Sequence, residues 1–157
     1  MESTLTEPLV AKDDAQRINE FEAALAELPE EMLIKCPLKH TFTPGLYLRQ
    51  IFMPKDSIIV SRRHLTEHPF IVLTGVADVF YELGGYVDRI EAPYVGITKP
   101  GTRRVLHIRE DSIWLTAHAT DLTDPDEIVA TVSEHENPML PPGFLDHAFE
   151  NKKELPL

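Results

Sequence analysis

The chain has 157 residues, 43% of them hydrophobic, which suits a single domain with one core. Its 26 acidic and 15 basic side chains give a formal net charge of −11, which disfavours binding to nucleic acids. The single cysteine, Cys36, excludes an intrachain disulfide and a thiolate metal site. The N-terminus is unlike a signal peptide, and no apolar run approaches the roughly 20 residues that cross a bilayer, so we expect a cytoplasmic protein without membrane association.

Residues 1–38 are expected to form a polar tail followed by an accessory helix. Asp13 or Asp14 can cap this helix, which runs to about residue 28 because Pro29 ends its pattern. Because its apolar stripe is narrow, the helix is predicted to lie against a sheet or a partner subunit. The apolar side chains that recur at helical spacing are Ile18, Phe21, Leu25 and Leu28.

Residues 39–123 are predicted to form an all-β, antiparallel jelly roll. Short β-rich runs alternate with turn residues, and no helix-length pattern interrupts them, which disfavours a parallel sheet. Turns are predicted at residues 54–56, 84–85, 100–101 and 110–111. The predicted strands are residues 46–53, 57–61, 70–74, 76–81, 86–90, 94–98, 103–108 and 112–119.

Residues 124–157 are predicted to form a short helix and an extended arm. Asp124 and Pro125 make a favourable helix start, and the helix would run to about Glu134. The arm that follows is rich in proline. Its apolar side chains could dock on the barrel or on a second subunit: Phe144, Leu145 and Phe149.

The densest set of metal-binding side chains lies between residues 61 and 70, where His64, Glu67 and His68 form the pattern H-x-x-E-H. A helix, which the zinc proteases with this pattern require, is disfavoured by Pro69 and by the flanking β-rich runs. On a strand–turn–strand, the two-residue period brings both imidazoles to the same end of the sheet. Two imidazoles suit zinc, iron, nickel or copper, and a metal would need at least one further ligand.

This strand–turn–strand resembles the first sequence motif of the cupin superfamily, in which two histidines and a glutamate precede a glycine. Gly75 matches the glycine, His68 stands at the glutamate and His64 at the second histidine. Arg62 stands at the first histidine and stays protonated, so it cannot be a metal ligand. The resemblance implies a double-stranded β-helix, the cupin jelly roll, with an N-terminal helix, a short C-terminal helix and an extended tail.

Residues 99–104 resemble the second cupin motif, with Gly101 at its glycine and Arg104 at its metal-binding histidine. A replacement ligand is His118, because the last strand of a cupin-like jelly roll pairs with the strand that carries His64. The implied metal is zinc, iron, nickel or manganese, and Glu67 is a candidate fourth group. The implied metal site is His64, His68 and His118. Alternatively, these histidines lie at the rim of the barrel and are satisfied by hydrogen bonds.

Two roles are open for Arg104, whose guanidinium group is expected to face into the barrel. It could clamp a carboxylate or a phosphate with two parallel hydrogen bonds, or it could form a salt bridge with Glu67 or Asp88. If the chain is an enzyme, Glu67 and Arg104 are the candidates for catalysis. The residues expected to line a site for a small anionic molecule are Tyr47, Arg49, Arg62 and Arg104.

The chain from about Lys39 to Thr123 is also similar to small cupin-like proteins of bacteriophage genomes. The likeness is carried by residues 40–49, 64–68, 91–93 and 98–105, and by Trp114 with His118. That group has no firmly assigned activity, so the resemblance implies a fold and a lineage, with the host cytoplasm as location, and no reaction. Analogy with the fold also implies a homodimer.

Three classes of function remain open. The first is a metal-dependent cupin enzyme. The second is a non-catalytic module that binds a small anion, which the arginines at two metal-ligand positions favour because cations repel a metal. The third is an oligomeric accessory protein without metal, which uses its helix and its arm for contacts.

Overall fold

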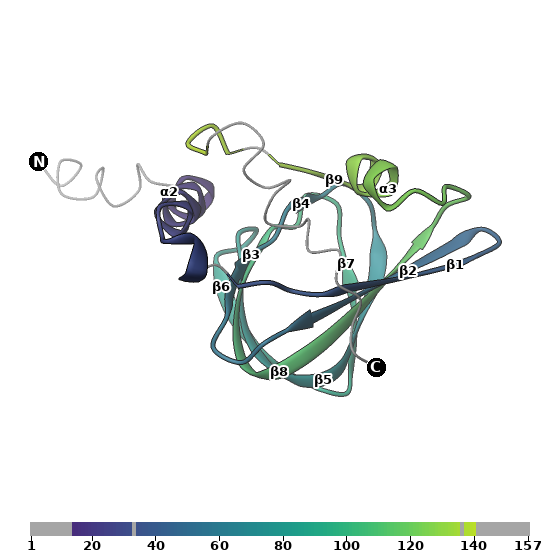
Figure 1. Cartoon of the computed structure of the whole chain (residues 1–157), viewed down its shortest axis with the longest axis horizontal. Helices are drawn as coiled ribbons and strands as arrows, with labels where there is room; N and C mark the ends of the chain where they lie inside the picture. The colour runs from purple at the N-terminus through teal and green to yellow at the C-terminus, as the bar shows by residue number, and fades with distance from the viewer. Residues whose placement is uncertain (1–13, 33, 136, 141–157) are drawn as a thin grey trace, which may run out of the picture.

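The computed structural model describes residues 14–32, 34–135 and 137–140 (Figure 1). Two α-helices, α2 (Asp14–Ala26) and α3 (Pro125–Val132), and a short 3₁₀ helix, η1 (Glu30–Met32), accompany the strands. The strands are β1 (Leu38–Thr43), β2 (Leu46–Met53), β3 (Ile58–Val60), β4 (Arg63–His64), β5 (His68–Tyr81), β6 (Tyr86–Glu91), β7 (Tyr94–Thr98), β8 (Arg104–Ala119) and β9 (Ser133–Glu134). Neither α-helix is long and apolar enough to cross a membrane.

Two long antiparallel strands, β5 and β8, form the frame of the barrel. The sheet has the order β1-β2-β8-β5-β6, with β3 also paired to β8 and β7 also paired to β5. The first half of β5 and the second half of β8 therefore belong to a layer with β1, β2 and β7, which we call the β7 layer. The other halves belong to a layer with β3 and β6, which we call the β6 layer. This is the antiparallel double-stranded β-helix that the sequence predicts.

The predicted boundaries are confirmed at several elements and wrong at two turns, and the strands β1, β4 and β9 were not predicted. Strands 46–53 and 94–98 are found as predicted, and Asp124 caps α3 by accepting a hydrogen bond from the backbone N–H of Asp126 at 2.9 Å. The predicted turn at residues 110–111 is wrong, because β8 runs through it. The predicted break at residue 75 is also wrong, because β5 crosses it with irregular register. The arm beyond residue 140 lies outside the described residues.

Gly75 explains why β5 bends there without ending. Its φ of +95° is one that glycine adopts readily, and β5 pairs with β8 on both sides of it. A Cβ at this position would lie 2.1 Å from Ser112 Oγ and 2.5 Å from the carbonyl oxygen of Asp111. The backbones of β5 and β8 therefore approach each other most closely at the bend between the two layers.

The core lies between the two layers. Alternate residues of β5 and β8 point inward, among them Phe70, Val72 and Trp114 from the β7 layer and Val79 and Ile108 from the β6 layer. The rings of Phe70 and Trp114 stack with centroids 5.2 Å apart. Trp114 is thus a core residue.

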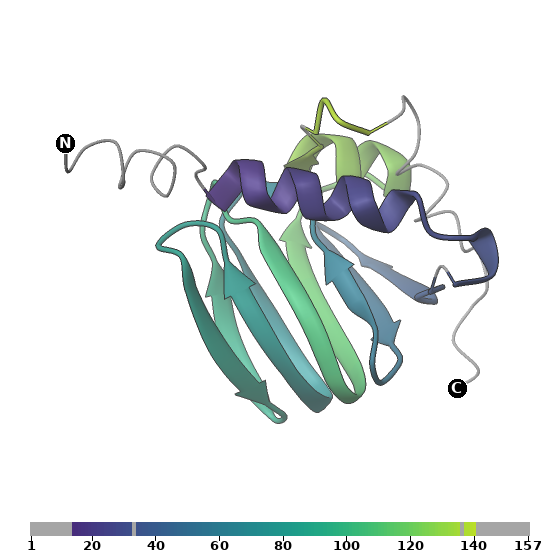
Figure 2. The same cartoon turned by 90° about the vertical axis from the view of Figure 1, so that its left-hand side faces the viewer.

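Helix α2 lies across one end of the barrel (Figure 2). Phe21 and Leu28, two members of its expected apolar stripe, are exposed, and the buried residues of the helix are Ile18 and Glu22. The helix is held mainly by the polar contacts of Asn19 and Glu22 with the barrel and with the segment after β9. The helix therefore lies against the barrel, one of its two predicted positions, but half of its apolar stripe stays exposed and the charged Glu22 is buried in the contact.

Candidate functional site

Three histidine rings lie together inside one end of the barrel. His64 is on β4, His68 begins β5, and His118 is near the end of β8. The ring centroids of His64 and His68 are 5.1 Å apart, and those of His68 and His118 are 4.4 Å apart. Both His68 and His118 are almost fully buried.

The strand pairing that brings these rings together differs from the expected one. β4 pairs with β9, with His64 opposite Ser133, and β8 does not pair with β4. Instead, β8 lies between β2 and β5, so that Tyr47 is opposite His118 and Phe70 is opposite Thr116. The expectation that the last strand pairs with the strand of His64 is wrong. Both edges of this part of β8 are already paired, with β2 and with β5, and the short strand that carries His64 pairs with β9.

Burial keeps the three imidazoles neutral at pH 7. Desolvation, followed by the positive charge of Arg104, lowers the pKa of His64 to about 3. Desolvation also lowers the pKa of His118 to about 4, with His68 and Arg49 as further causes. For His68, desolvation lowers the pKa while a backbone hydrogen bond to Thr66 partly opposes it. Neutral imidazole is the form that binds metals. It can also donate a hydrogen bond from one ring nitrogen and accept one at the other.

Arg104 is buried without a carboxylate. Its side chain is almost fully enclosed, one terminal nitrogen donates to Thr98 Oγ1 at 2.9 Å, and the guanidinium lies 4.9 Å from the ring centroid of Phe70 and 5.3 Å from that of Tyr81. Desolvation lowers the pKa of Arg104. Among the described residues, no ion pair joins Arg104 to an acidic side chain.

The expected salt bridge of Arg104 with Glu67 or Asp88 is therefore wrong. Glu67 is more than half exposed and pairs with Lys99 at the surface, and Asp88 is exposed on β6. The acidic partners belong to the preceding residue, Arg103, which contacts carboxylates of α2 and of the loop after β5. The position of Glu67 gives no support to its expected roles as a fourth metal ligand or as a catalytic acid or base.

Arg49 faces the interior from β2, opposite Thr116 of β8. Desolvation lowers its pKa, and the positive charge of Arg62 lowers it further. Arg62 lies close by, but its Nε donates to Ser133 Oγ at 2.9 Å. The described residues provide no hydrogen bond to the Nε of Arg49, which is buried.

Tyr47 connects the histidines to the edge of the barrel. Its hydroxyl group lies 2.6 Å from His40 Nδ1, and its ring is stacked on that of His118 with centroids 5.8 Å apart. Burial raises the pKa of Tyr47 to about 12, so the phenol stays protonated. The sequence analysis did not identify His40, although cross-strand pairing of β1 with β2 places it opposite Arg49.

The interior of the barrel is rich in buried polar atoms that lack partners. In the described part of the chain, every buried side-chain nitrogen or oxygen without a hydrogen bond is a nitrogen. Those of the arginines and the tryptophan can only donate, whereas each imidazole nitrogen can donate or accept. The atoms are Arg49 Nε, Arg104 Nε, Trp114 Nε1, His64 Nδ1, His68 Nε2 and His118 Nδ1. Such groups are costly unless water or a ligand satisfies them.

The fit to a metal ion is partial. His68 Nδ1 lies 3.0 Å from the carbonyl oxygen of Thr66 and must donate to it, which leaves the lone pair on the buried Nε2 free to bind a metal. However, no group of three or more His, Cys, Asp or Glu side chains in the described ranges is arranged to hold a metal ion. Arg49 and Arg104 also oppose a cation at this end of the barrel.

Comparisons with known proteins agree with the fold. Neither a protein-family model nor a curated protein matches the sequence. The structure is similar to the DMSP lyase DddQ from Ruegeria pomeroyi, with a TM-score of 0.50 and 15% identity over 62% of this chain and 53% of that one. It is also similar to the cupin domain of Schizosaccharomyces pombe Cnp3, with a TM-score of 0.46 and 21% identity over 60% of this chain and 68% of that one.

A third similar structure is a cupin-2 domain protein from Shewanella frigidimarina, with a TM-score of 0.45 and 9% identity over 64% of this chain and 92% of that one. At these identities the likeness concerns the fold and not the activity. The antiparallel strand order, with two long strands shared between two layers, is that of a jelly roll. The chain has the fold of an antiparallel jelly roll, a double-stranded β-helix.

Proposed function

We propose that this protein binds a small oxyanion, a carboxylate or a phosphate, inside the end of its barrel. The observation that carries the proposal is a pair of inward-facing arginines, Arg49 and Arg104, whose Nε atoms are buried without a partner and whose guanidinium groups have no carboxylate among the described residues. A buried charge without a counter-charge is strongly destabilising, and an oxyanion would supply both the charge and the missing acceptors.

The surrounding groups suit an anion. Arg49 is opposite Thr116, whose hydroxyl group contacts His118, and Arg104 donates to Thr98, which is opposite His68, so both arginines lie beside the histidines. A guanidinium binds a carboxylate or a phosphate through two parallel hydrogen bonds, which are among the stronger ones in proteins. The neutral imidazoles can each donate one N–H without adding charge.

Binding can be measured as thermal stabilisation by inorganic phosphate and by acetate or malonate at constant ionic strength. A ligand that binds the folded state raises the melting temperature in proportion to ln(1 + [L]/Kd), so the shift should follow a single-site curve. Arg104→Met and Arg49→Met should each weaken binding at least about tenfold. Lys99→Met, which removes a surface cation outside the barrel, is the matched control and should leave binding unchanged.

Two results would contradict the proposal. One is a melting temperature that none of these anions raises. The other is stabilisation that persists undiminished in Arg104→Met and Arg49→Met, since the anion would then bind elsewhere on the protein.

A second candidate function is the binding of a divalent metal ion (zinc, iron, nickel or manganese) by His64, His68 and His118. It is favoured by the lone pair on His68 Nε2 and by the neutral state of the rings. An anion bound to the arginines would reduce their repulsion of the metal, so the two functions are compatible. The side chains around these three histidines do not indicate a particular reaction for such a metal site.

Metal analysis of the protein as purified, and again after chelation and reloading, separates this candidate from the first. Metal bound at one equivalent that disappears in His68→Ala and persists in His107→Ala, on the outer face of β8, would support it. A folded protein that takes up none of the four metals would exclude it without affecting anion binding. An accessory role in a phage, in the host cytoplasm, stays a prediction of the resemblance alone.

A further inference from the structure

The outer face of the β7 layer is apolar, although the inner face of the same layer forms part of the core. Side chains alternate between the two faces of a strand, and residues directly opposite each other on paired strands share a face. Ile71 is opposite both Val95 of β7 and Leu115 of β8, and Leu48 of β2 is opposite Ala117 of β8. All of these side chains point away from the buried set.

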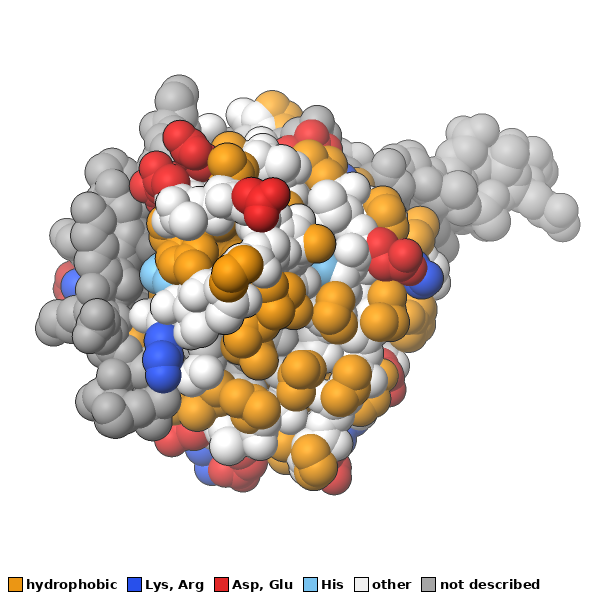
Figure 3. All heavy atoms as spheres, turned by 90° about the vertical axis from the view of Figure 1, so that its right-hand side faces the viewer, with side chains coloured by type: hydrophobic (Ala, Val, Ile, Leu, Met, Phe, Trp, Pro, Cys, Tyr) orange, Lys and Arg blue, Asp and Glu red, His pale blue; other side chains and the backbone are white. Residues whose placement is uncertain are grey.

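Several side chains of this outer face are exposed. Val95, Ile97 and Leu73 are 68%, 53% and 46% exposed. Figure 3 shows hydrophobic side chains gathered with few charges between them on the side of the molecule where β7 and the end of β8 lie. Contiguous apolar surface of this kind marks sites of association more often than single exposed residues do.

The distribution of charge distinguishes this face from the rest of the molecule. Outward positions of the five paired strands carry one charged side chain, Lys39 at the β1 edge, and no acidic one. The outer face of the β6 layer is different: there the carboxylate of Asp78 pairs with both Arg89 and Arg109. A solvated sheet face in this protein therefore carries charges, and the face of the β7 layer does not.

We propose that the outer face of the β7 layer is the interface between two copies of this chain. Each copy carries a formal net charge of −11, so two copies repel each other over most of their surfaces and least where acidic groups are missing. A face that is apolar and nearly uncharged is complementary to itself, as a two-fold symmetric contact requires. Helix α2 lies across one end of the barrel, where it contacts Arg103 and the segment after β9 and not this face.

The proposal can be tested by sedimentation velocity of the full chain from low micromolar to submillimolar concentrations. The wild type should sediment as a dimer with twice the 17.8 kDa mass of the chain. Val95→Glu places a carboxylate at the centre of the contact and should weaken dimerisation at least about tenfold. Val87→Glu is the matched control: Val87 is a valine on the edge strand β6 with 66% exposure, on the charged face, and this variant should dimerise as the wild type does.

Ile97→Thr, which keeps a β-branched side chain, is a second variant on the same face and should weaken the dimer if Val95→Glu does not fold. A wild type that stays monomeric at all concentrations would overturn the proposal. Equal behaviour of Val95→Glu and Val87→Glu would also overturn it. A monomeric wild type whose melting temperature falls in Val95→Glu and not in Val87→Glu would assign the face to another segment of the same chain.

Discussion

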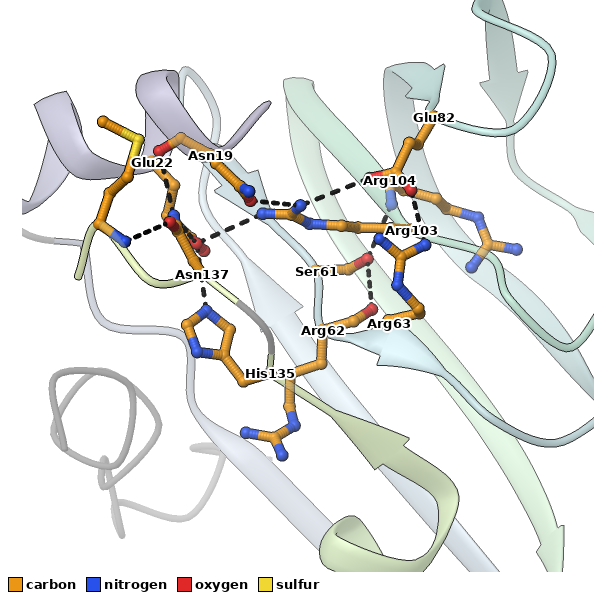
Figure 4. A network of polar contacts seen from close by, with 11 residues as sticks. Asn19, Glu22, Ser61, Arg62, Arg63, Glu82, Arg103, Arg104, His135 and Asn137 are labelled. Atoms are coloured by element: carbon orange, nitrogen blue, oxygen red, sulfur yellow. Dashed lines mark hydrogen bonds and ion pairs between the residues drawn. The ribbon is translucent and has the colours of Figure 1, made fainter. Parts of the chain in front are cut away.

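Arg103 and Arg104 are adjacent in the sequence, yet their guanidinium groups point in opposite directions and enter different environments (Figure 4). Arg103 contacts Glu22 of α2 and Glu82 after β5, both at 3.4 Å, and donates to Asn19 Oδ1 at 2.7 Å. Arg104 enters the barrel, where it contacts Thr98 and two aromatic rings. One buried cation is paired and the other is not.

Substitution of these two arginines should therefore have opposite effects on stability. Arg103→Met leaves the buried carboxylate of Glu22 without this cation, while the part-buried Glu82 keeps Arg63, and should lower the free energy of unfolding by about 3 kcal/mol. Arg104→Met removes a buried charge that has no counter-charge and should leave stability within about 1 kcal/mol of the wild type, or above it, when no anion is present. Chemical denaturation in a buffer free of phosphate and carboxylates measures both, and similar losses in the two variants would contradict this interpretation.

The stability of the protein should depend on pH through the buried histidines. The pKa values of about 3 for His64 and about 4 for His118 lie below the ordinary value of 6.5, so between these limits the unfolded chain binds more protons than the folded one. Stability is then complete above pH 6.5 and falls as the pH decreases toward 4. Each tenfold difference in proton affinity corresponds to about 1.4 kcal/mol, so the loss amounts to several kcal/mol.

Urea denaturation at a series of pH values between 8 and about 4.5 measures this loss. His64→Leu should flatten the curve below pH 6.5 because one of the two titrating groups is gone. An unchanged slope in this variant would show that other groups are responsible for the pH dependence.

A comparison of alanine substitutions at Gly75 and Gly101 distinguishes two energetic costs of an added Cβ: steric contact with a neighbouring strand and a positive φ. Both have a positive φ, +95° and +88°, but an added Cβ meets Ser112 and Asp111 at Gly75 and nothing within 4 Å at Gly101. Gly101→Ala should cost about 1 kcal/mol, and Gly75→Ala about 3 kcal/mol or more because β5 and β8 must also move apart. Thermal unfolding of the two variants measures the difference in stability. Equal losses of stability would mean that β5 and β8 move apart at the bend without an energetic cost.

The N-cap of α3 should contribute a modest, local part of the stability. Asp124→Ala removes the side-chain acceptor for the Asp126 N–H and should lower the free energy of unfolding by about 1 kcal/mol. Asp124→Asn keeps an acceptor and should recover most of the loss. If Asn behaves as Ala does, the carboxylate stabilises the helix by its charge and not by this hydrogen bond.

The site could be predicted from the sequence in part. The inward positions of Tyr47, Arg49, Arg104 and His118 follow from the two-residue period along single strands. The period cannot give the partner of a strand, so the pairing of β8 with the strand of His64 was wrongly expected. The two-residue period along a strand also does not determine which acidic side chain an arginine will pair with. A salt bridge of Arg104 with Glu67 or Asp88 was one of its two predicted roles, and the carboxylates of Glu22 and Glu82 in fact pair with Arg103.

The sequence by itself determined the all-β class, several strand boundaries, the cap of α3 and the inward-facing positions along single strands, because these depend on local periodicity and on short-range backbone chemistry. Only the tertiary structure decided that residues 68–81 and 104–119 are continuous strands, since pairing with a neighbouring strand maintains them through a bend that local sequence marks as a turn. It also decided that Glu22 of α2 is buried against the barrel and that apolar side chains on the outer face of the β7 layer are exposed. These features depend on contacts between residues far apart in the chain, which no local pattern encodes.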